Sequence, residues 1–350
     1  MAIPQDPESA FRNQVAYCLA SNAPVTAQAN KSIWNALDDT TEFGRRILGW
    51  PLQAMADALP LRATGGFHAL WLSGAEPGLA AIYGETMGDE TTCDAAVREA
   101  LHRHEDALLP WLDGPPQTNE AGRSANYIAA MHWLSSKGVV PRFELNEIGS
   151  SAGLNLLLAH YRYDLAGVTS GPEDAALDFS PEWKGSPPPE TPFTILSAQG
   201  CDVAPVDLRD PAQALRLKAY IWPEHHVRFE RMEKAIALVE KSSPDLVKAD
   251  AADWVDMRLA TPQAAGTTRT LVHSIVWQYL PDATQDRITR AMEIAGSKAT
   301  PDKPLAWIAV EANRETYRHE LVVRYWPGGG EPILLGAAHP HGAWIDWVGS

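Results

Sequence analysis

The sequence predicts an α/β protein with a mostly parallel sheet that has an antiparallel edge, preceded by a helical N-terminal region. Three observations carry this prediction. Apolar residues in the first 140 positions recur at helical spacing and show no strand-like alternation. Beyond residue 140, short runs rich in branched residues alternate with helical stretches, as in parallel βα units. The last runs follow one another closely, as strands joined by hairpins do.

The region 1–115 is expected to fold as helices on the substrate side of the protein. The apolar run 67–72 predicts one helix, and residues 94–111 predict another that is capped near Thr92. The Asp-Gly-Pro-Pro run at 113–116 ends the second helix, because glycine and proline do not continue a helix.

The region 116–350 is expected to hold the sheet, interrupted by an insertion at 164–191 that is rich in Pro, Gly and Ser and reads as a loop. Its candidate strands are apolar runs bounded by turn residues, at 143–148, 193–197, 246–249, 270–276, 305–310, 321–325, 332–335 and 343–347. Helices are expected at 154–160, at 211–241 with a break at Pro223, and at 283–295.

Composition limits the class of partner. The chain of 350 residues has a formal net charge of −15 at pH 7, which disfavours duplex nucleic acid and anionic membranes as partners and favours a small-molecule substrate. Three distant cysteines suit a reducing cytoplasm and lack zinc spacing, so we expect no metal site. No apolar run approaches the roughly 18 residues of a membrane span, and the first eight residues lack the features of a secretory signal. We therefore expect a cytoplasmic protein whose oligomeric state stays open.

The most informative segment is 142–158, which reads as a strand, a tight turn of small residues and the start of a helix. Gly149 and Gly153 flank Ser151 in that turn. Glycines at such a position allow a backbone to approach a ligand, and a helix N-terminus offers unpaired N–H groups. The spacing therefore predicts a nucleotide-type ligand here.

Acidic residues follow the next two candidate strands. In an open α/β sheet, ligands bind beyond the carboxyl ends of the strands, where the strand order reverses. Asp202 follows the second strand and is the expected acceptor of ribose hydroxyls, whereas Asp250 follows the third and is expected near an adenine edge. The insertion leaves Asp164 as an alternative ribose acid.

Landmarks spread over nearly the whole chain resemble the bacterial family called domain of unknown function 2332. They are Gln-Thr-Asn-Glu at 117–120 with Arg123, Glu-Ile-Gly-Ser-Ser-Ala-Gly-Leu-Asn-Leu at 147–156, Tyr-Arg-Tyr-Asp at 161–164, Gly-Cys-Asp-Val-Ala-Pro-Val-Asp at 200–207, Trp-Pro-Glu at 222–224, Asp-Ala at 250–251 and His-Pro-His-Gly at 339–342. The family resemblance is specific, but it implies little about activity.

The segment beginning at Glu147 also resembles the first motif of class I S-adenosylmethionine-dependent methyltransferases, Glu/Asp-x-Gly-x-Gly-x-Gly. That resemblance implies a Rossmann-like methyltransferase-type sheet, S-adenosylmethionine as the cofactor and a small molecule as the methyl acceptor. The cofactor-binding residues it implies are Glu147, Gly149, Ser151, Gly153, Asn155, Asp202 and Asp250. Ser151 departs from the motif, because it replaces the central glycine and narrows the approach to the backbone.

Two further segments have a functional and a structural interpretation. Gln117, Asn119 and Glu120 open a helix that runs into the first strand, so together with Arg123 they either cover the cofactor site or cap the helix. Trp277 follows the fourth strand, where it either meets substrate or closes the core.

Two other functions compete with methyl transfer. Gly149-x-Ser151-x-Gly153 also fits the nucleophile elbow of a serine hydrolase, with Asp250 or Asp253 as the acid and His273, His339 or His341 as the base. The helical region upstream and the nearby Glu147 disfavour it, since an anion opposes a developing oxyanion. The third possibility is a non-catalytic binding protein of the same fold. The sequence identifies no catalytic base, and in-line methyl transfer does not require one.

Overall fold

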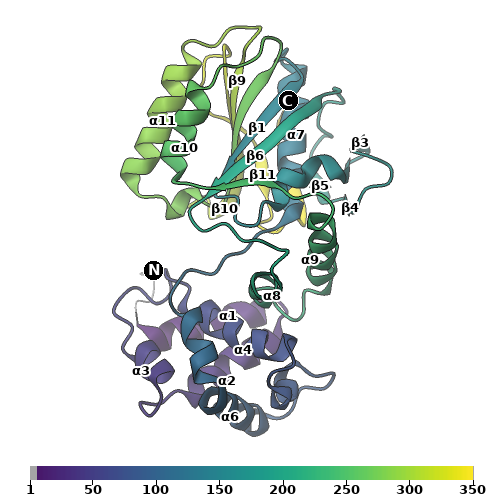
Figure 1. Ribbon diagram of the computed structural model, residues 1–350. Helices are drawn as coiled ribbons and strands as arrows, with labels where there is room; N and C mark the ends of the chain where they lie inside the picture. The colour runs from purple at the N-terminus through teal and green to yellow at the C-terminus, as the bar shows by residue number, and fades with distance from the viewer. Residues whose placement is uncertain (1–5, 350) are drawn as a thin grey trace. The chain divides into compact units, whose positions relative to one another are not determined.

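The computed structural model describes residues 6–349, which form two compact units (Figure 1). The first comprises the chain up to Thr118 together with Arg209–Met232, and the second comprises Asn119–Leu208 together with the chain from Glu233 onward. The expected division at residue 115 left Arg209–Met232 in the sheet domain, whereas this segment packs with the first unit. Residues 1–5, on which part of the expected helical region and of the signal-peptide argument falls, lie outside the described residues.

The first unit is helical, as predicted. Its helices are α1 (Pro7–Ala20), α2 (Pro24–Ala36), α3 (Glu42–Leu48), α4 (Leu59–Leu72), α5 (Ala80–Tyr83), α6 (Glu90–Leu108) and α8 (Pro211–Ala219), with 3-10 turns η1 (Pro77–Leu79) and η2 (Leu109–Trp111). Phe11, Ile33, Phe43, Phe67 and Leu101 are completely or almost completely buried in one core. Helix α6 begins earlier than predicted, because Asp89 rather than Thr92 is its N-cap and accepts a hydrogen bond from Thr92 N at 2.8 Å.

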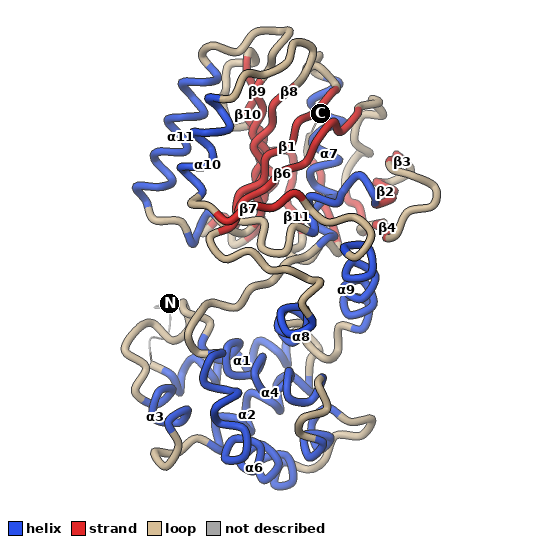
Figure 2. Tube along the Cα trace, viewed as in Figure 1, coloured by secondary structure: helices blue, strands red, loops and turns tan. Residues whose placement is uncertain are grey.

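The second unit is built on a nine-stranded sheet with the strand order β5-β12-β11-β10-β9-β8-β1-β6-β7 (Figure 2). Five adjacent strands are parallel: β7 (Asp245–Lys248), β6 (Thr194–Asp202), β1 (Arg142–Ile148), β8 (Thr268–Ser274) and β9 (Leu305–Asn313). Strands β10 (Arg318–Trp326), β11 (Ile333–Ala338) and β12 (Trp344–Trp347) continue as an antiparallel meander, and β5 (Glu182–Lys184) pairs parallel with β12. The predicted α/β class, with its antiparallel edge, is confirmed.

Helices cover both faces of this sheet (Figure 1). Helix α7 (Ser124–Ser136) lies on one face, and α10 (Ala251–Ala260) and α11 (Asp282–Gly296) lie on the other. Successive side chains of a strand point to opposite faces, so Ile148 packs with Trp254 and Met292 on the α10–α11 face, whereas Glu147 points to the α7 face and meets Tyr127. Strand β9 is buried on both faces along most of its length, which explains its continuous apolar run 305–310.

The insertion is not the loop expected from its composition. Together with the three residues before it, its first part forms a separate three-stranded sheet of β2 (Tyr161–Leu165), β3 (Val168–Ser170) and β4 (Leu177–Phe179), and β5 adds a strand to the main sheet. Tyr161, Tyr163 and Phe179 are buried against one another, and this aromatic core holds the small sheet. The segment after the first turn is the 3-10 helix η4 (Leu154–His160) rather than an α-helix.

Two short 3-10 turns, η3 (Ala121–Arg123) and η5 (Trp277–Tyr279), precede α7 and follow β8, and α9 (His226–Val239) carries the chain from the Arg209–Met232 segment back to the sheet unit. In the described part of the chain, no helix combines the length and the apolar character needed to span a membrane.

Candidate functional site at the carboxyl ends of the parallel strands

The turn after β1 has the left-handed backbone that its glycines suggested. Gly149, Ser151 and Gly153 have φ values of 67°, 53° and 72°. A Cβ atom on Gly149 would lie 2.3 Å from Val276 Cγ2, and one on Gly153 would lie 2.7 Å from Pro244 Cβ. The chain's own side chains therefore require both glycines, in addition to any ligand that approaches them.

Ser151 ties this turn to the end of the neighbouring strand β6. Its N–H donates to Asp202 Oδ2 at 2.9 Å, and the other oxygen of Asp202 accepts from Ala204 N at 2.8 Å. The carbonyl oxygen of Ser151 accepts from Val206 N at 3.0 Å. The Ser151 hydroxyl is buried and has no hydrogen-bond partner within residues 6–349.

Asp164, the alternative ribose acid, lies elsewhere. It belongs to β2 of the small sheet, and its side chain accepts from Gly167 N at 2.7 Å in the turn between β2 and β3. The structure thus brings Asp202, and not Asp164, to the turn after β1.

Glu147 is the most unusual residue of this edge. It is 2% exposed at the end of β1, and its Oε1 accepts from Asn155 Nδ2 at 2.9 Å and from Tyr127 Oη at 3.4 Å. Among the described residues, neither Glu147 Oε2 nor Asn155 Oδ1 has a hydrogen-bond partner, although both atoms are buried. Burial raises the pKa of Glu147 to about 7, although hydrogen bonds from its neighbours lower it.

A second carboxylate lies near the carboxyl end of β9, the fifth parallel strand along the chain. Glu311 Oε1 accepts from His273 Nδ1 at 2.6 Å and from Val276 N at 3.2 Å, while its Oε2 is buried and unpartnered in the described part of the protein. Tyr127 is fully buried and feels the charges of both Glu147 and Glu311, and burial is the main reason why its pKa lies well above 10. Sequence reasoning missed Tyr127 and Glu311, although Glu311 directly follows the predicted strand 305–310.

His273 is held by two hydrogen bonds. Trp307 Nε1 donates to its Nε2 at 2.8 Å, so Nδ1 carries the proton and donates to Glu311. The ring of Trp277 stacks on His273 with centroids 5.0 Å apart and an interplanar angle of 18°. Neither ring nitrogen is left to act as a base, and Trp277 lies against this network.

Asn119 approaches the same turn from the loop just before η3. Its Oδ1 accepts from Leu154 N at 2.9 Å and so caps η4. The sequence led us to expect a cap on the helix that follows Asn119, so it caps a different helix from the one expected. Glu120 is 5% exposed and lies close enough to Tyr161 for its charge to act on that phenol. Gln117 lies in the loop before Thr118, at the end of the first unit.

Arg123 connects two of the sequence landmarks. Its Nε donates to Pro340 O at 2.7 Å, and Gly342 packs so closely on Gly122 that a Cβ atom on Gly342 would lie 2.5 Å from the Gly122 carbonyl carbon. The turn at Gly122 and Arg123 thus packs against the His-Pro-His-Gly segment at 339–342. The charge of Arg123 also stabilises ionised Glu147.

Asp250 reaches this edge through β7. Its side chain caps α10 by accepting from Ala252 N at 2.9 Å and Asp253 N at 3.1 Å, and the preceding residue donates from Ala249 N to Asp202 O at 3.0 Å. The acids expected for ribose and adenine therefore lie on adjacent strand ends. Residues 6–349 hold no cluster of three or more His, Cys, Asp or Glu side chains arranged to bind a metal.

Comparison with known proteins identifies the family of this chain but indicates no activity for it. No curated protein and no solved structure shows significant similarity to it. A family model matches residues 8–347, almost the full length. The chain therefore belongs to the bacterial family described as "Uncharacterized protein conserved in bacteria (DUF2332)".

Proposed function

We propose that this protein binds S-adenosylmethionine at the carboxyl edge of its parallel strands and transfers the methyl group to a small molecule. The observation that carries the proposal is Glu147, which is buried at the end of β1 with one carboxylate oxygen unpartnered. A buried acceptor without a donor is costly, so a ligand that supplies donors is favoured there.

The strand order supports the choice of a nucleotide-type ligand. The parallel strands run β7-β6-β1-β8-β9, so the order of strands along the chain reverses beside β1. In doubly wound sheets the ligand crevice opens at this reversal, beyond the carboxyl ends of the strands. Glu147, the following turn and Asp202 all lie at that edge.

The residues present fit the cofactor's functional groups. Glu147 Oε2 and Asn155 Oδ1 are two buried acceptors suited to an ammonium group. Each oxygen of Asp202 accepts one backbone N–H and retains capacity for a ribose hydroxyl, while Asp250 at the next strand end suits the adenine side. The Ser151 hydroxyl offers a donor to a carboxylate.

When bound, the cofactor supplies an electrophilic methyl group. The protein's task is then to orient the reactants and exclude water. Tyr127 stays protonated because its pKa is raised, so it remains a hydrogen-bond donor toward Glu147. Trp277, stacked on His273, offers an apolar ring surface on the acceptor side.

The same geometry gives less support to a serine hydrolase. A hydrolase needs a base within hydrogen-bond reach of the Ser151 hydroxyl, and that hydroxyl has no partner in residues 6–349. His273 uses both ring nitrogens for other contacts, and Asp250 caps a helix. A non-catalytic binding protein shares the proposed ligand site and is separated from the enzyme only by experiment.

The test is isothermal titration at pH 8 with S-adenosylmethionine and with 5′-methylthioadenosine, which lacks the amino-acid part. We expect micromolar affinity for S-adenosylmethionine, equivalent to about −8 kcal/mol. Glu147→Gln should weaken S-adenosylmethionine binding about tenfold and leave 5′-methylthioadenosine unchanged, because only the former carries the ammonium group. Asp202→Asn should weaken both ligands, and Asp164→Asn, the matched control, should affect neither.

Binding should also strengthen as the pH rises through 7, because the ammonium group prefers ionised Glu147. Absence of binding at millimolar ligand in folded protein would remove the proposal. Tight binding without methyl transfer to any acceptor tried, in a panel of small nucleophiles, would favour the binding protein. A serine-directed probe whose adduct disappears in Ser151→Ala would instead favour the hydrolase.

A further inference from the structure

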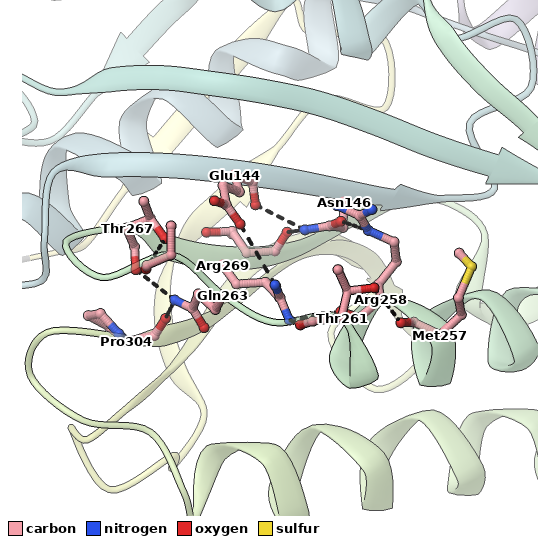
Figure 3. Close-up of polar contacts among 11 residues, drawn as sticks. Glu144, Asn146, Met257, Arg258, Thr261, Gln263, Thr267, Arg269 and Pro304 are labelled. Atoms are coloured by element: carbon pink, nitrogen blue, oxygen red, sulfur yellow. Dashed lines mark hydrogen bonds and ion pairs between the residues drawn. The ribbon is translucent and has the colours of Figure 1, made fainter.

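A groove of about 500 Å³ lies between α10 and α11 at the opposite, amino-terminal end of the parallel strands. Strand β8 begins at Thr268, and Arg269 at its start lines the groove. Figure 3 shows the polar contacts around Arg269 at the end of α10. All of these elements belong to the sheet unit.

Arg269 is a cation that the chain satisfies only in part. The residue is 5% exposed, and its Nη1 donates to the carbonyl oxygens of Arg258 and Thr261, each at 2.8 Å (Figure 3). A guanidinium has five N–H donors. The N–H on Nε is buried without a hydrogen-bond partner, and Nη2 forms no hydrogen bond within the described chain.

The ion pairing of Arg269 is also incomplete. Its nearest carboxylate oxygen, Glu144 Oε2, lies 3.9 Å from Nε, which is longer than a hydrogen bond. Arg258 donates from Nε to the amide oxygen Asn146 Oδ1 at 2.6 Å (Figure 3), and its charge also acts on Arg269. Burial and the charge of Arg258 lower the pKa of Arg269, while Glu144 raises it.

The rest of the groove adds positive charge. Lys298 and Lys303 line it, and neither ammonium group forms an ion pair in residues 6–349. The one carboxylate in the lining, Asp256, is bound to Arg287 at 2.6 Å. Three cations thus face a groove with one neutralised acid, in a chain whose net charge is −15.

The remaining lining is mostly apolar, with the side chains of Leu259, Ala260, Ala291, Ile294, Ala295, Ala299 and Leu305. A ligand that fits has an anionic head for the cations and an apolar body for this wall. We propose that the groove between α10 and α11 binds a carboxylate-bearing amphiphile, with its head on Arg269 and its chain along the apolar lining.

The test is titration of the full-length protein with octanoate, below micelle formation, followed by calorimetry or ligand-observed NMR. Octanol and octyltrimethylammonium have the same chain and serve as head-group controls, and acetate tests the head alone. We expect saturable binding of octanoate that is at least tenfold tighter than that of each of the other three.

Variants locate the site. Arg269→Gln should abolish binding, and the exposed pair Lys298→Glu with Lys303→Glu should weaken it about tenfold without affecting the fold. Lys241→Glu, which is exposed at a distant point on the chain, makes the same type of charge change and should leave binding unaltered. Retained folding is checked by thermal unfolding, and if Arg269→Gln unfolds, the lysine variants decide.

Equal binding of octanol and octanoate would overturn the proposal, because the cations would then have no part in recognition. It would equally be overturned by the absence of saturable octanoate binding, or by binding that persists unchanged in the double lysine variant. None of these results depends on the cofactor proposed for the other end of the sheet, so the two proposals fail separately.

Discussion

The two ends of the sheet differ in which buried polar groups lack a hydrogen-bond partner. At the carboxyl end, Glu147 and Glu311 each keep a buried oxygen without a donor, whereas at the amino end Arg269 keeps the buried N–H on Nε without an acceptor. Strand β1 contributes to both, since Glu144 and Glu147 are three residues apart and point to opposite faces. The comparison teaches that the partner, and not the residue type, determines what a carboxylate does in the sheet: Glu144 compensates the charge of Arg269, whereas Glu147 is fully buried with one oxygen unpartnered.

The largest effect is expected at the turn that supports the carboxyl end. Gly149→Val places a branched side chain at φ 67° against Val276, so left-handed strain and overlap should together lower the free energy of unfolding by about 4 kcal/mol. Gly138→Val is the matched control, because Gly138 has φ 82° but no atom within 4 Å of its would-be Cβ. It should cost about 2 kcal/mol. Urea unfolding measures both, and equal losses would contradict the packing argument.

The next effect concerns the pH dependence of stability. Folded Glu147 has a pKa of about 7 and its ordinary value is 4.5, so the folded state holds the proton more tightly. The resulting stabilisation is complete below pH 4.5 and is lost as the pH rises through 7, a fall of about 3 kcal/mol. Glu147→Gln should flatten this part of the profile and be more stable than the wild type at pH 8. An unchanged slope in the variant would assign the pH dependence to another group.

Glu144→Gln should act in the opposite direction. Removing this carboxylate leaves the buried charge of Arg269 beside that of Arg258 without its nearby carboxylate, so we expect a loss of about 2 kcal/mol in the free energy of unfolding. The loss should be nearly the same at pH 6 and pH 8, whereas the effect of Glu147→Gln should change with pH. Octanoate should bind this variant more tightly, because the competing carboxylate is gone. Unchanged octanoate affinity would show that the charge of Glu144 does not act on the ligand in the groove.

The smallest effect is expected on the rim of the groove. Arg287 pairs with Asp253 at 2.7 Å and with Asp256 at 2.6 Å and thereby joins α10 to α11, but all three side chains are substantially exposed. Arg287→Ala should therefore cost less than about 1 kcal/mol in unfolding free energy. It also frees the Asp256 charge beside the groove, so octanoate binding should weaken about twofold. If the free energy of unfolding falls by more than the free energy of octanoate binding, Arg287 acts mainly by holding the two helices together.

The sequence was a good guide where local pattern and burial agree. The runs predicted at 143–148, 246–249 and 305–310 correspond to β1, β7 and β9 within a few residues. The clearest of them is β9, because a strand buried on both faces reads as a continuous apolar segment. The break expected at Pro223 separates α8 from α9. The insertion was misread, because its turn-forming composition outweighed the buried alternation of Leu177 and Phe179.

The candidate site was predicted in part. The edge of the sheet, the turn and the acids at the strand ends followed from the order of elements, and they do lie together through Ser151 and Asp202. Tyr127 and Glu311 were missed because they come from a helix before β1 and a strand far along the chain. Whether these residues hold S-adenosylmethionine stays a prediction.

By itself the sequence determined the class of fold, the position of the turn and the glycines in it, because these depend on local backbone preference and on the periodicity of apolar residues. Only the tertiary structure decided that Asp202 rather than Asp164 meets the turn and that Arg209–Met232 returns to the helical unit. Only the tertiary structure decided that Arg269 lines a groove and keeps an N–H donor without an acceptor. The physical reason is that hydrogen bonding and charge compensation depend on neighbours brought from distant parts of the chain, which no local pattern specifies.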